Sequence, residues 1–206
     1  MHALYFRSGT QVWCYHRDDG MNLLNLLRAD LDRQYQLAGS PGRANLWRIV
    51  GRTFHPRFLP LVFLRTAQEL ESARIPICPQ VFAYLNLILF GIEVAPKCAI
   101  GPGLFLPHTV GTVIGAWSIG RDVTIFQNVT LGAKTADMGW NIEKRPSVGD
   151  GVILGAGCKI LGSVHLGAGS IVGANAVVLR DVPENVTVVG IPATIVRSTE
   201  PLGEGI

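Results

Sequence analysis

Residues 148–178 read VGDGVILGAGCKILGSVHLGAGSIVGANAVV, and an aliphatic residue returns at every sixth position. Glycine directly follows most of these residues. The spacing begins upstream, and the full series is Val94, Ile100, Leu106, Ile119, Ile125, Leu131, Val148, Leu154, Ile160, Leu166, Val172 and Val178. A period of six matches neither the helical period of about 3.6 residues nor the two-residue period of a strand. It is typical of a parallel β-helix built from hexapeptide repeats.

The repeat also predicts how the coils pack. Three edges of six residues make one triangular coil of about eighteen residues, so each strand lies on its counterpart one coil further along. Glycines at the corners let adjacent backbones approach closely. A second inward column is expected four places after each aliphatic residue, formed by Cys98, Val110, Val123, Val129, Val152, Cys158, Val164, Ser170, Ala176 and Val182. The two cysteines of this column are therefore expected to be core residues and not nucleophiles.

The first ninety residues follow a helical pattern instead. Leu23, Leu24, Leu27 and Leu31 form one apolar stripe, and further helices are expected over about 43–53, 59–73 and 79–90. Residues 1–20 show no clear period, and they are either an ordered arm or the product of a start codon upstream of Met21. The expected fold class is α+β, divided into the arm 1–20, an α-helical region 21–91, a β-helix 92–196 and a C-terminal tail 197–206.

Composition excludes several classes of function. Of the 206 residues 48% are apolar and 16% are charged, and the net charge of +3 comes without a basic run, which argues against nucleic acid as a partner. Four widely spaced cysteines without a CxxC pair fit a reducing compartment and give no metal site or disulfide framework. The apolar runs are too short to span a bilayer, although peripheral membrane contact through residues 58–90 stays open. We expect a cytoplasmic protein.

The hexapeptide repeat is interrupted twice. The spacing slips between Leu106 and Ile119, where His108 lies, and a loop, GAKTADMGWNIEKRP (132–146), is inserted before Val148. A lone histidine among apolar residues is usually structural. Loops that leave a rigid scaffold, however, are where function tends to lie, so the position of His108 favours a functional role.

Residues 92–196 resemble the serine acetyltransferase branch of the hexapeptide acyltransferases. The resemblance rests on "PHTVGTVIG" (107–115), "VTLG" (129–132) and "GIPA" (190–193) within the repeat. It implies a left-handed β-helix and direct transfer of acetyl from acetyl-CoA, used as co-substrate, to a hydroxyl group. It implies that His108 is the general base, because a neutral imidazole can accept a proton near neutral pH. Glu93 matches the family aspartate that orients this base.

The resemblance also implies where the cofactor binds. In the family the pantetheine arm lies in a groove between adjacent subunits, against the backbone of small residues. A homotrimer is therefore expected, and a hexamer less so, because the helical region is short. The family's basic residue after its G-x-P-A motif is Thr194 here, so a cation near the nucleotide must come from elsewhere. The positions expected to bind acetyl-CoA are Ala133, Lys134, Gly155, Ala156, Gly173, Ala174, Pro192, Ala193 and Arg197.

Two departures from the family pattern concern the acceptor. Pro107 replaces the aspartate that binds serine, and the second active-site histidine is Arg145, preceded by Lys144. The inserted loop also carries Trp140, a surface on which a sugar can stack. We therefore take Arg145, Lys144 and Trp140 as acceptor-binding residues. These changes favour acetyl transfer to the hydroxyl of a sugar or saccharide precursor.

Two alternatives remain. The first is a serine O-acetyltransferase of cysteine synthesis, in which a carboxylate of the helical region, such as Asp30 or Asp32, would hold the serine ammonium. The second, of another class, is a non-catalytic β-helical assembly protein, which the retention of His108 and its motif argues against.

Overall fold

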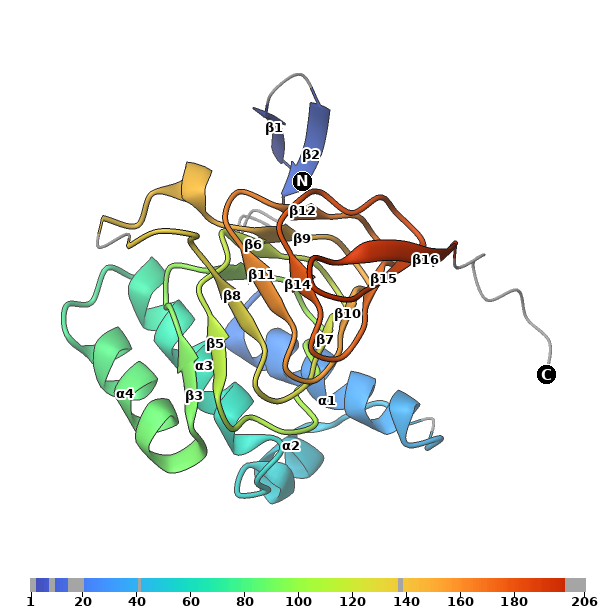
Figure 1. Cartoon of the computed structure of the whole chain (residues 1–206). Coiled ribbons are helices and arrows are strands. Elements are labelled where there is room, and N and C mark those ends of the chain that lie inside the picture. Colours follow the sequence, from blue (N-terminus) through green and yellow to red (C-terminus); the bar gives the residue numbers. More distant parts are fainter. Residues whose placement is uncertain (1–2, 8–9, 15–20, 41, 137–138, 199–206) are drawn as a thin grey trace.

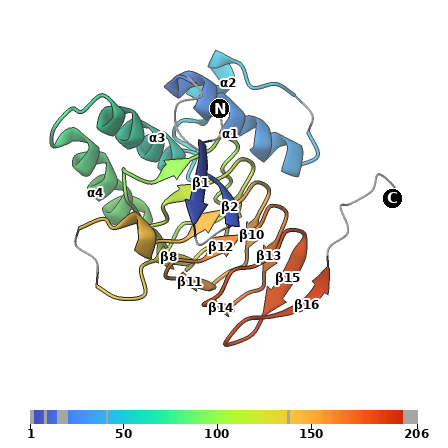
Figure 2. The same ribbon diagram turned by 90° about the horizontal axis from the view of Figure 1, so that it is seen from above.

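The computed structural model describes residues 3–7, 10–14, 21–40, 42–136 and 139–198, with the backbone alone for 3–7, 10–14 and 197–198. Figure 1 shows a helical layer beside a coiled stack of short strands, and Figure 2 shows the helices gathered at one end of that stack. The last strands, β15 (Val186–Val189) and β16 (Thr194–Ser198), lie at the other end. Within residues 1–20, β1 (Ala3–Arg7) and β2 (Thr10–Cys14) pair as an antiparallel hairpin.

The four expected helices are present. They are α1 (Leu23–Leu37), α2 (Leu46–Arg52), α3 (Leu59–Ser72) and α4 (Cys78–Phe90). The side chains of Asn22 and Asn45 cap the first two by accepting backbone N–H groups. Gly91 ends α4 with a left-handed φ of +63°, which glycine adopts without strain. The predicted stripe on α1 was partly wrong, because Leu24 is 37% exposed while Leu26 is buried in its place.

Three parallel sheets form the faces of the β-helix. The first orders its strands β16-β15-β13-β10-β7, the second β14-β11-β8-β5-β3, and the third β12-β9-β6-β4, with only β16 antiparallel. The remaining elements are β3 (Ile92–Val94), β4 (Ala99–Ile100), β5 (Thr112–Ile114), β6 (Ser118–Ile119), β7 (Thr124–Ile125), β8 (Thr130–Gly132), η1 (Ile142–Lys144), β9 (Ser147–Val148), β10 (Ile153–Leu154), β11 (Lys159–Leu161), β12 (His165–Leu166), β13 (Ile171–Val172) and β14 (Val177–Val178).

The strand register confirms the eighteen-residue coil. Leu154 pairs with Val172 and Ile160 pairs with Val178, an offset of eighteen residues in both cases. All twelve aliphatic residues of the repeat are buried. Most of the glycines after them, Gly132 excepted, lie against the next coil: a Cβ added to Gly155 would stand 2.7 Å from a backbone nitrogen. The repeat therefore encodes both the core and the close spacing of its coils.

The first coil departs from the regular repeat and corrects one prediction. Val94 pairs with Ile114, twenty residues on, because two extra residues follow Leu106. Val110, expected to point inward, lies on this bulge and is 70% exposed. Thr112 takes its inward position instead and is 1% exposed, while Ile114 continues the aliphatic column in register with Leu131.

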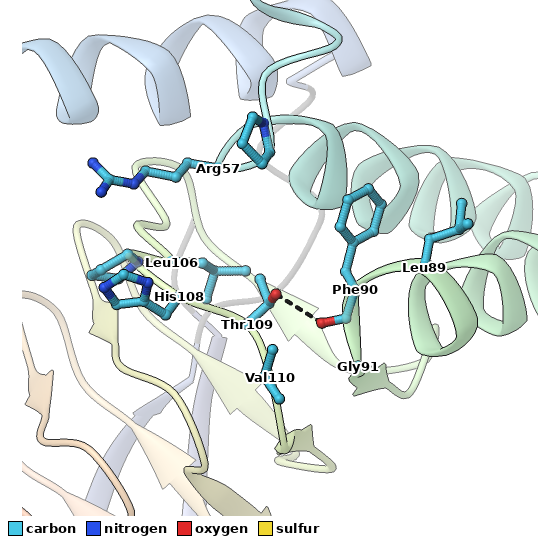
Figure 3. A pocket seen from close by; sticks show the side chains of 10 residues that line it. Arg57, Leu89, Phe90, Gly91, Leu106, His108, Thr109 and Val110 are labelled. Carbon is cyan, nitrogen blue, oxygen red and sulfur yellow. Dashed lines mark hydrogen bonds between the residues drawn. The ribbon is translucent and has the colours of Figure 1, made fainter.

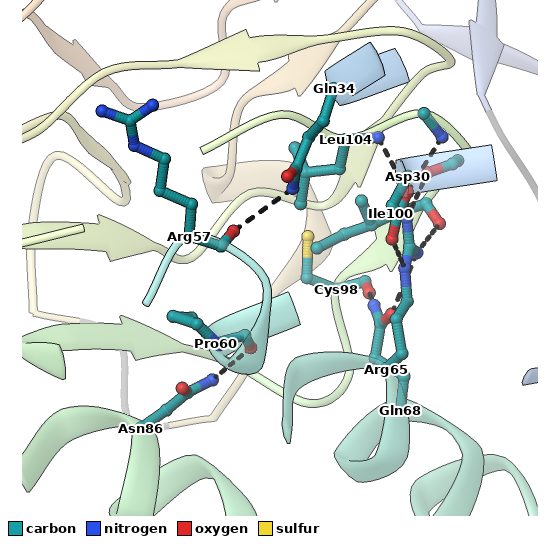
Figure 4. A network of polar contacts seen from close by, with 12 residues as sticks. Asp30, Gln34, Arg57, Pro60, Arg65, Gln68, Asn86, Cys98, Ile100 and Leu104 are labelled. Atoms are coloured by element: carbon teal, nitrogen blue, oxygen red, sulfur yellow. Dashed lines mark hydrogen bonds and ion pairs between the residues drawn. The ribbon is translucent and has the colours of Figure 1, made fainter. Parts of the chain in front are cut away.

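A buried polar cluster joins the helical layer to the first coil (Figure 4). Asp30 of α1 and Arg65 of α3 form a double hydrogen bond, with both N–O distances 2.9 Å, and both side chains are fully buried. Asp30 also accepts the backbone N–H groups of Gly103 and Leu104, each at 2.9 Å. Arg65 donates to backbone carbonyl groups of the same coil, at 2.7 Å to Ile100. This coil segment leads directly to the loop that carries His108.

Candidate active site

His108 lines a cavity of about 410 Å³ where the helical layer meets the β-helix (Figure 3). One wall comes from the end of α4, with Leu89 and Phe90, and another from the bulge, with Pro107. The loop between α2 and α3 adds Arg57. The cavity thus takes residues from three separate segments of the chain.

The bulge that carries His108 is attached to the end of α4. The hydroxyl of Thr109 donates to the carbonyl of Phe90 at 2.8 Å, and the N–H of Gly111 donates to the carbonyl of Gly91 at 2.9 Å. Leu106, just before the bulge, is buried in the core. His108 is exposed between these two anchored points. Its ring therefore projects from a fixed backbone into the cavity.

Six of the predicted cofactor residues lie along the same edge of the β-helix as this bulge. Backbone hydrogen bonds between successive corners form this edge: the N–H of Asn128 donates to the carbonyl of Val110 at 3.0 Å, and the N–H of Asn175 donates to the carbonyl of Ala156 at 2.8 Å. The turn after β15 joins the ladder, because the N–H of Ala193 donates to Val177 at 2.8 Å. The residues that this edge brings together are Gly155, Ala156, Gly173, Ala174, Pro192 and Ala193.

Ala133 and Lys134 lie along a different edge. They follow β8, and the adjacent Gly132 accepts the N–H of Gly162, which follows β11, at 2.8 Å. A single chain therefore presents the predicted cofactor residues on two separate edges of the triangular stack. Arg197 belongs to β16, and its side chain lies outside the described ones.

Known proteins share this arrangement of helices and coils. The model of the bacterial transferase hexapeptide family (six repeats) matches residues 145–180. A serine acetyltransferase of Synechococcus elongatus is 39% identical over 143 residues, which are 69% of this chain and 57% of that protein. One of Helicobacter pylori is 37% identical over 168 residues, which are 79% of this chain and 95% of that protein. This chain belongs to the serine acetyltransferase family.

A crystal structure agrees with this assignment. The serine acetyltransferase of Brucella abortus in complex with coenzyme A superposes with a TM-score of 0.72 at 30% identity, covering 86% of this chain and 68% of that one. The likeness confirms the expected fold, a helical region followed by a left-handed β-helix. The chain spans only about 57% of the Synechococcus relative but nearly all of the Helicobacter one.

Glu93, the predicted orienting carboxylate, lies on β3, two residues after Gly91 of the cavity wall, but does not line the cavity. Its side chain is exposed between the buried Ile92 and Val94. Among the described residues, no hydrogen bond or ion pair joins Glu93 to His108. Its orienting role stays a prediction.

The predicted acceptor residues of the inserted loop lie apart from His108. The guanidinium of Arg145 donates to the carbonyl of Gly115 at 3.0 Å, and its carbon atom stands 3.9 Å from the centre of the Trp140 ring. Arg145 therefore covers one face of the indole that was expected to stack on a sugar. Lys144 is exposed at the end of η1. None of these three lines the described cavity.

The cysteines of the core behave as the repeat predicted. Burial raises the pKa of the Cys98 thiol and of the Cys158 thiol to about 12. A thiol with so high a pKa is protonated at neutral pH and is a poor nucleophile. Neither is a candidate for a covalent intermediate.

Among the described residues no group of three His, Cys, Asp or Glu side chains is placed to hold a metal ion, and no helix is long and apolar enough to cross a membrane.

Sequence reasoning missed Arg57 as a cavity residue and misjudged Asp30. Arg57 lies in a short connection without a motif, and only the tertiary fold brings it near His108. Asp30 and Asp32 were considered as partners for a serine ammonium group. Asp30 is fully buried against Arg65, Asp32 accepts the N–H of Ala44, and neither lines the cavity.

Proposed function

We propose that the chain transfers the acetyl group of acetyl-CoA to the hydroxyl of serine. The observation that carries the proposal is the Helicobacter relative, which is aligned over 95% of its length, helical region included. This alignment favours the serine alternative over the saccharide hypothesis that the sequence motifs first suggested. The retained motif around His108 argues for an enzyme and against a purely structural assembly protein.

His108 would act as the general base. It would take the proton of the acceptor hydroxyl as the oxygen attacks the thioester carbon, and return that proton to the departing thiolate. The exposure of His108 at an anchored bulge supports this role, because the ring can reach a bound acceptor while its backbone is held. The thioester is already activated, so no acyl-enzyme is needed, in keeping with the protonated core thiols.

We also propose that the active unit is a homotrimer. Its support is the division of the predicted cofactor residues between two edges of one chain. If the edge with His108 meets the edge with Ala133 and Lys134 of a neighbouring copy, both sets line one groove. Sedimentation at assay concentrations would test this, and an active monomer would contradict it.

The absence of any described disulfide is compatible with a cytoplasmic site of action, which we retain as a proposal.

A specific observation keeps saccharide acetylation as the second candidate. No carboxylate lines the described cavity, and Pro107 stands where the family has its serine-binding aspartate. An unpaired ammonium group taken out of water costs several kcal/mol by order of magnitude. Serine transfer therefore requires that the ammonium stay hydrated or find a carboxylate outside this cavity.

The deciding experiment is a thiol-release assay with acetyl-CoA against serine, homoserine and a panel of sugars. We expect saturable turnover of serine with kcat/KM above about 10⁴ M⁻¹s⁻¹, a typical enzyme value. Poor serine turnover together with saturable turnover of a sugar, weakened by Trp140→Ala, would instead establish the saccharide candidate. Thiol release that is independent of any acceptor would contradict both.

A further inference from the structure

Arg57 is the cationic side chain that faces His108 across the cavity. In Figure 3 the guanidinium group and the imidazole ring both extend away from Leu89 and Phe90 at the end of α4. They come from opposite walls, since Arg57 belongs to the connection between α2 and α3 and His108 to the bulge of the first coil. A ligand in this cavity can therefore meet both groups at once.

The backbone of Arg57 is held while its side chain is exposed. Its carbonyl accepts from the side chain of Gln34 at 3.2 Å, and its N–H donates to the Nδ1 atom of His55 at 3.3 Å. The next residue, Phe58, is fully buried. The origin of the side chain is thus fixed relative to α1 and the core. The guanidinium therefore extends from a fixed point beside the cavity.

The charge of Arg57 has no counter-ion in the described part of the chain. No ion pair joins it to an acidic residue there, and no carboxylate lines the cavity. Arg145, the cation that the sequence motif suggested for anion binding, is instead engaged by Gly115 and the Trp140 ring. Among the described lining residues Arg57 is therefore the one with a permanent positive charge.

We propose that Arg57 binds the carboxylate of the amino-acid acceptor and so determines its specificity; this rests on the proposed serine acetyltransferase function. An arginine fork pairs with a carboxylate through two parallel hydrogen bonds. In serine the carboxylate and the hydroxyl oxygen are separated by two carbon atoms, so anchoring the first group places the second near His108. Arg57 is a positioning residue that takes no part in the proton transfer.

The test compares two acceptors that differ only in the carboxylate. Wild type, Arg57→Gln and Arg57→Lys are assayed with serine and with serinamide, at saturating acetyl-CoA. Because a hydrogen-bonded charge pair is lost, Arg57→Gln should raise KM for serine on the order of 10- to 100-fold. With serinamide it should change kcat/KM by no more than about twofold, and Arg57→Lys should recover part of the serine activity. KM for acetyl-CoA should be unchanged, which separates an acceptor carboxylate from a phosphate of the co-substrate.

Arg52→Gln is the matched control. Arg52 lies five residues earlier, on α2, and it lines a neighbouring cavity but not that of His108. It should leave both acceptors within about twofold of wild type, and thermal unfolding should confirm that every variant is folded. Equal losses with serine and serinamide, or no loss with either, would overturn the role of Arg57. A wild-type enzyme that does not use serine would overturn the proposed function itself, and this role with it.

Discussion

The two halves of the molecule are stabilised in different ways. In the β-helix, aliphatic columns are buried and the coils stack through backbone hydrogen bonds between successive turns. The buried apolar face of the helical layer joins the same core, but its junction with the first coil also contains the ion pair of Asp30 and Arg65 and the side chain of Gln68, which donates to Cys98 at 2.6 Å. The repetitive half is thus encoded locally, whereas the junction adds polar partners that are distant in the sequence.

This difference explains what the sequence could predict. Every hexapeptide specifies its own inward residue, so the coils, their core and their glycine corners followed from the spacing alone. The prediction was wrong at Val110, where two inserted residues shift the chain outward. The spacing alone does not show which residues of the bulge leave the core and which return to it. Polar partners such as Asp30 and Gly103, 73 residues apart, leave no local pattern at all.

The candidate site divides in the same way. His108 and the small residues of the cofactor edge were found because they interrupt or complete a repeat that resembles a family motif. Arg57 was missed, since its contact with the cavity arises only when the helical layer docks on the first coil. The sequence also gave no reason to expect that Arg145 would lie over Trp140. The site residues within the repeat were predictable from the sequence. The contacts made by residues of the helical layer and of the inserted loop were not.

The largest expected effect is the loss of activity when His108 is removed from the bulge where the helical layer meets the β-helix. His108→Ala should lower kcat by about 10²- to 10⁴-fold, the usual contribution of general acid–base catalysis. Because the side chain is exposed, the free energy of unfolding should stay within about 0.5 kcal/mol of the wild-type value, as for surface substitutions. Steady-state kinetics and calorimetry measure both. Near wild-type turnover would return His108 to a structural role.

Loss of the buried ion pair between Asp30 and Arg65 should cause the largest decrease in stability. Asp30→Asn leaves Arg65 buried without its counter-charge, which costs about 3–5 kcal/mol when one partner of a buried pair is removed. Hydrogen exchange should show faster opening of α1 and α3 than of β10 to β14. The matched control is Asp32→Asn, a partly exposed neighbour that accepts a single N–H and should cost about 1 kcal/mol. Equal effects of the two variants would argue against a special role of the cluster.

A cavity in the β-helix tests the other half. Leu154→Ala removes a fully buried side chain and should cost about 2–5 kcal/mol, as in other large-to-small core substitutions. Exchange should now quicken in the strands adjacent to β10, namely β7 and β13, while the helical layer keeps its protection. Urea unfolding and hydrogen exchange check this. Uniform loss of protection across both halves would show that they unfold as one unit.

The smallest effect compares the two buried thiols as the pH is raised. Each is neutral in the folded state because burial raises the pKa of Cys98 and Cys158 to about 12, whereas an unfolded thiol ionises near its usual pKa of about 9. Folding is therefore favoured below about pH 9, and stability falls as the pH rises toward 12, by about 1.4 kcal/mol per pH unit for each thiol. Urea unfolding at pH 8 and pH 10 should show a fall about 1.4 kcal/mol smaller for Cys158→Ala than for wild type. Cys98→Ala should behave in the same way, because its thiol is also buried and its pKa is raised to about 12. A pH dependence that either substitution leaves unchanged would contradict a buried, neutral thiol at that position.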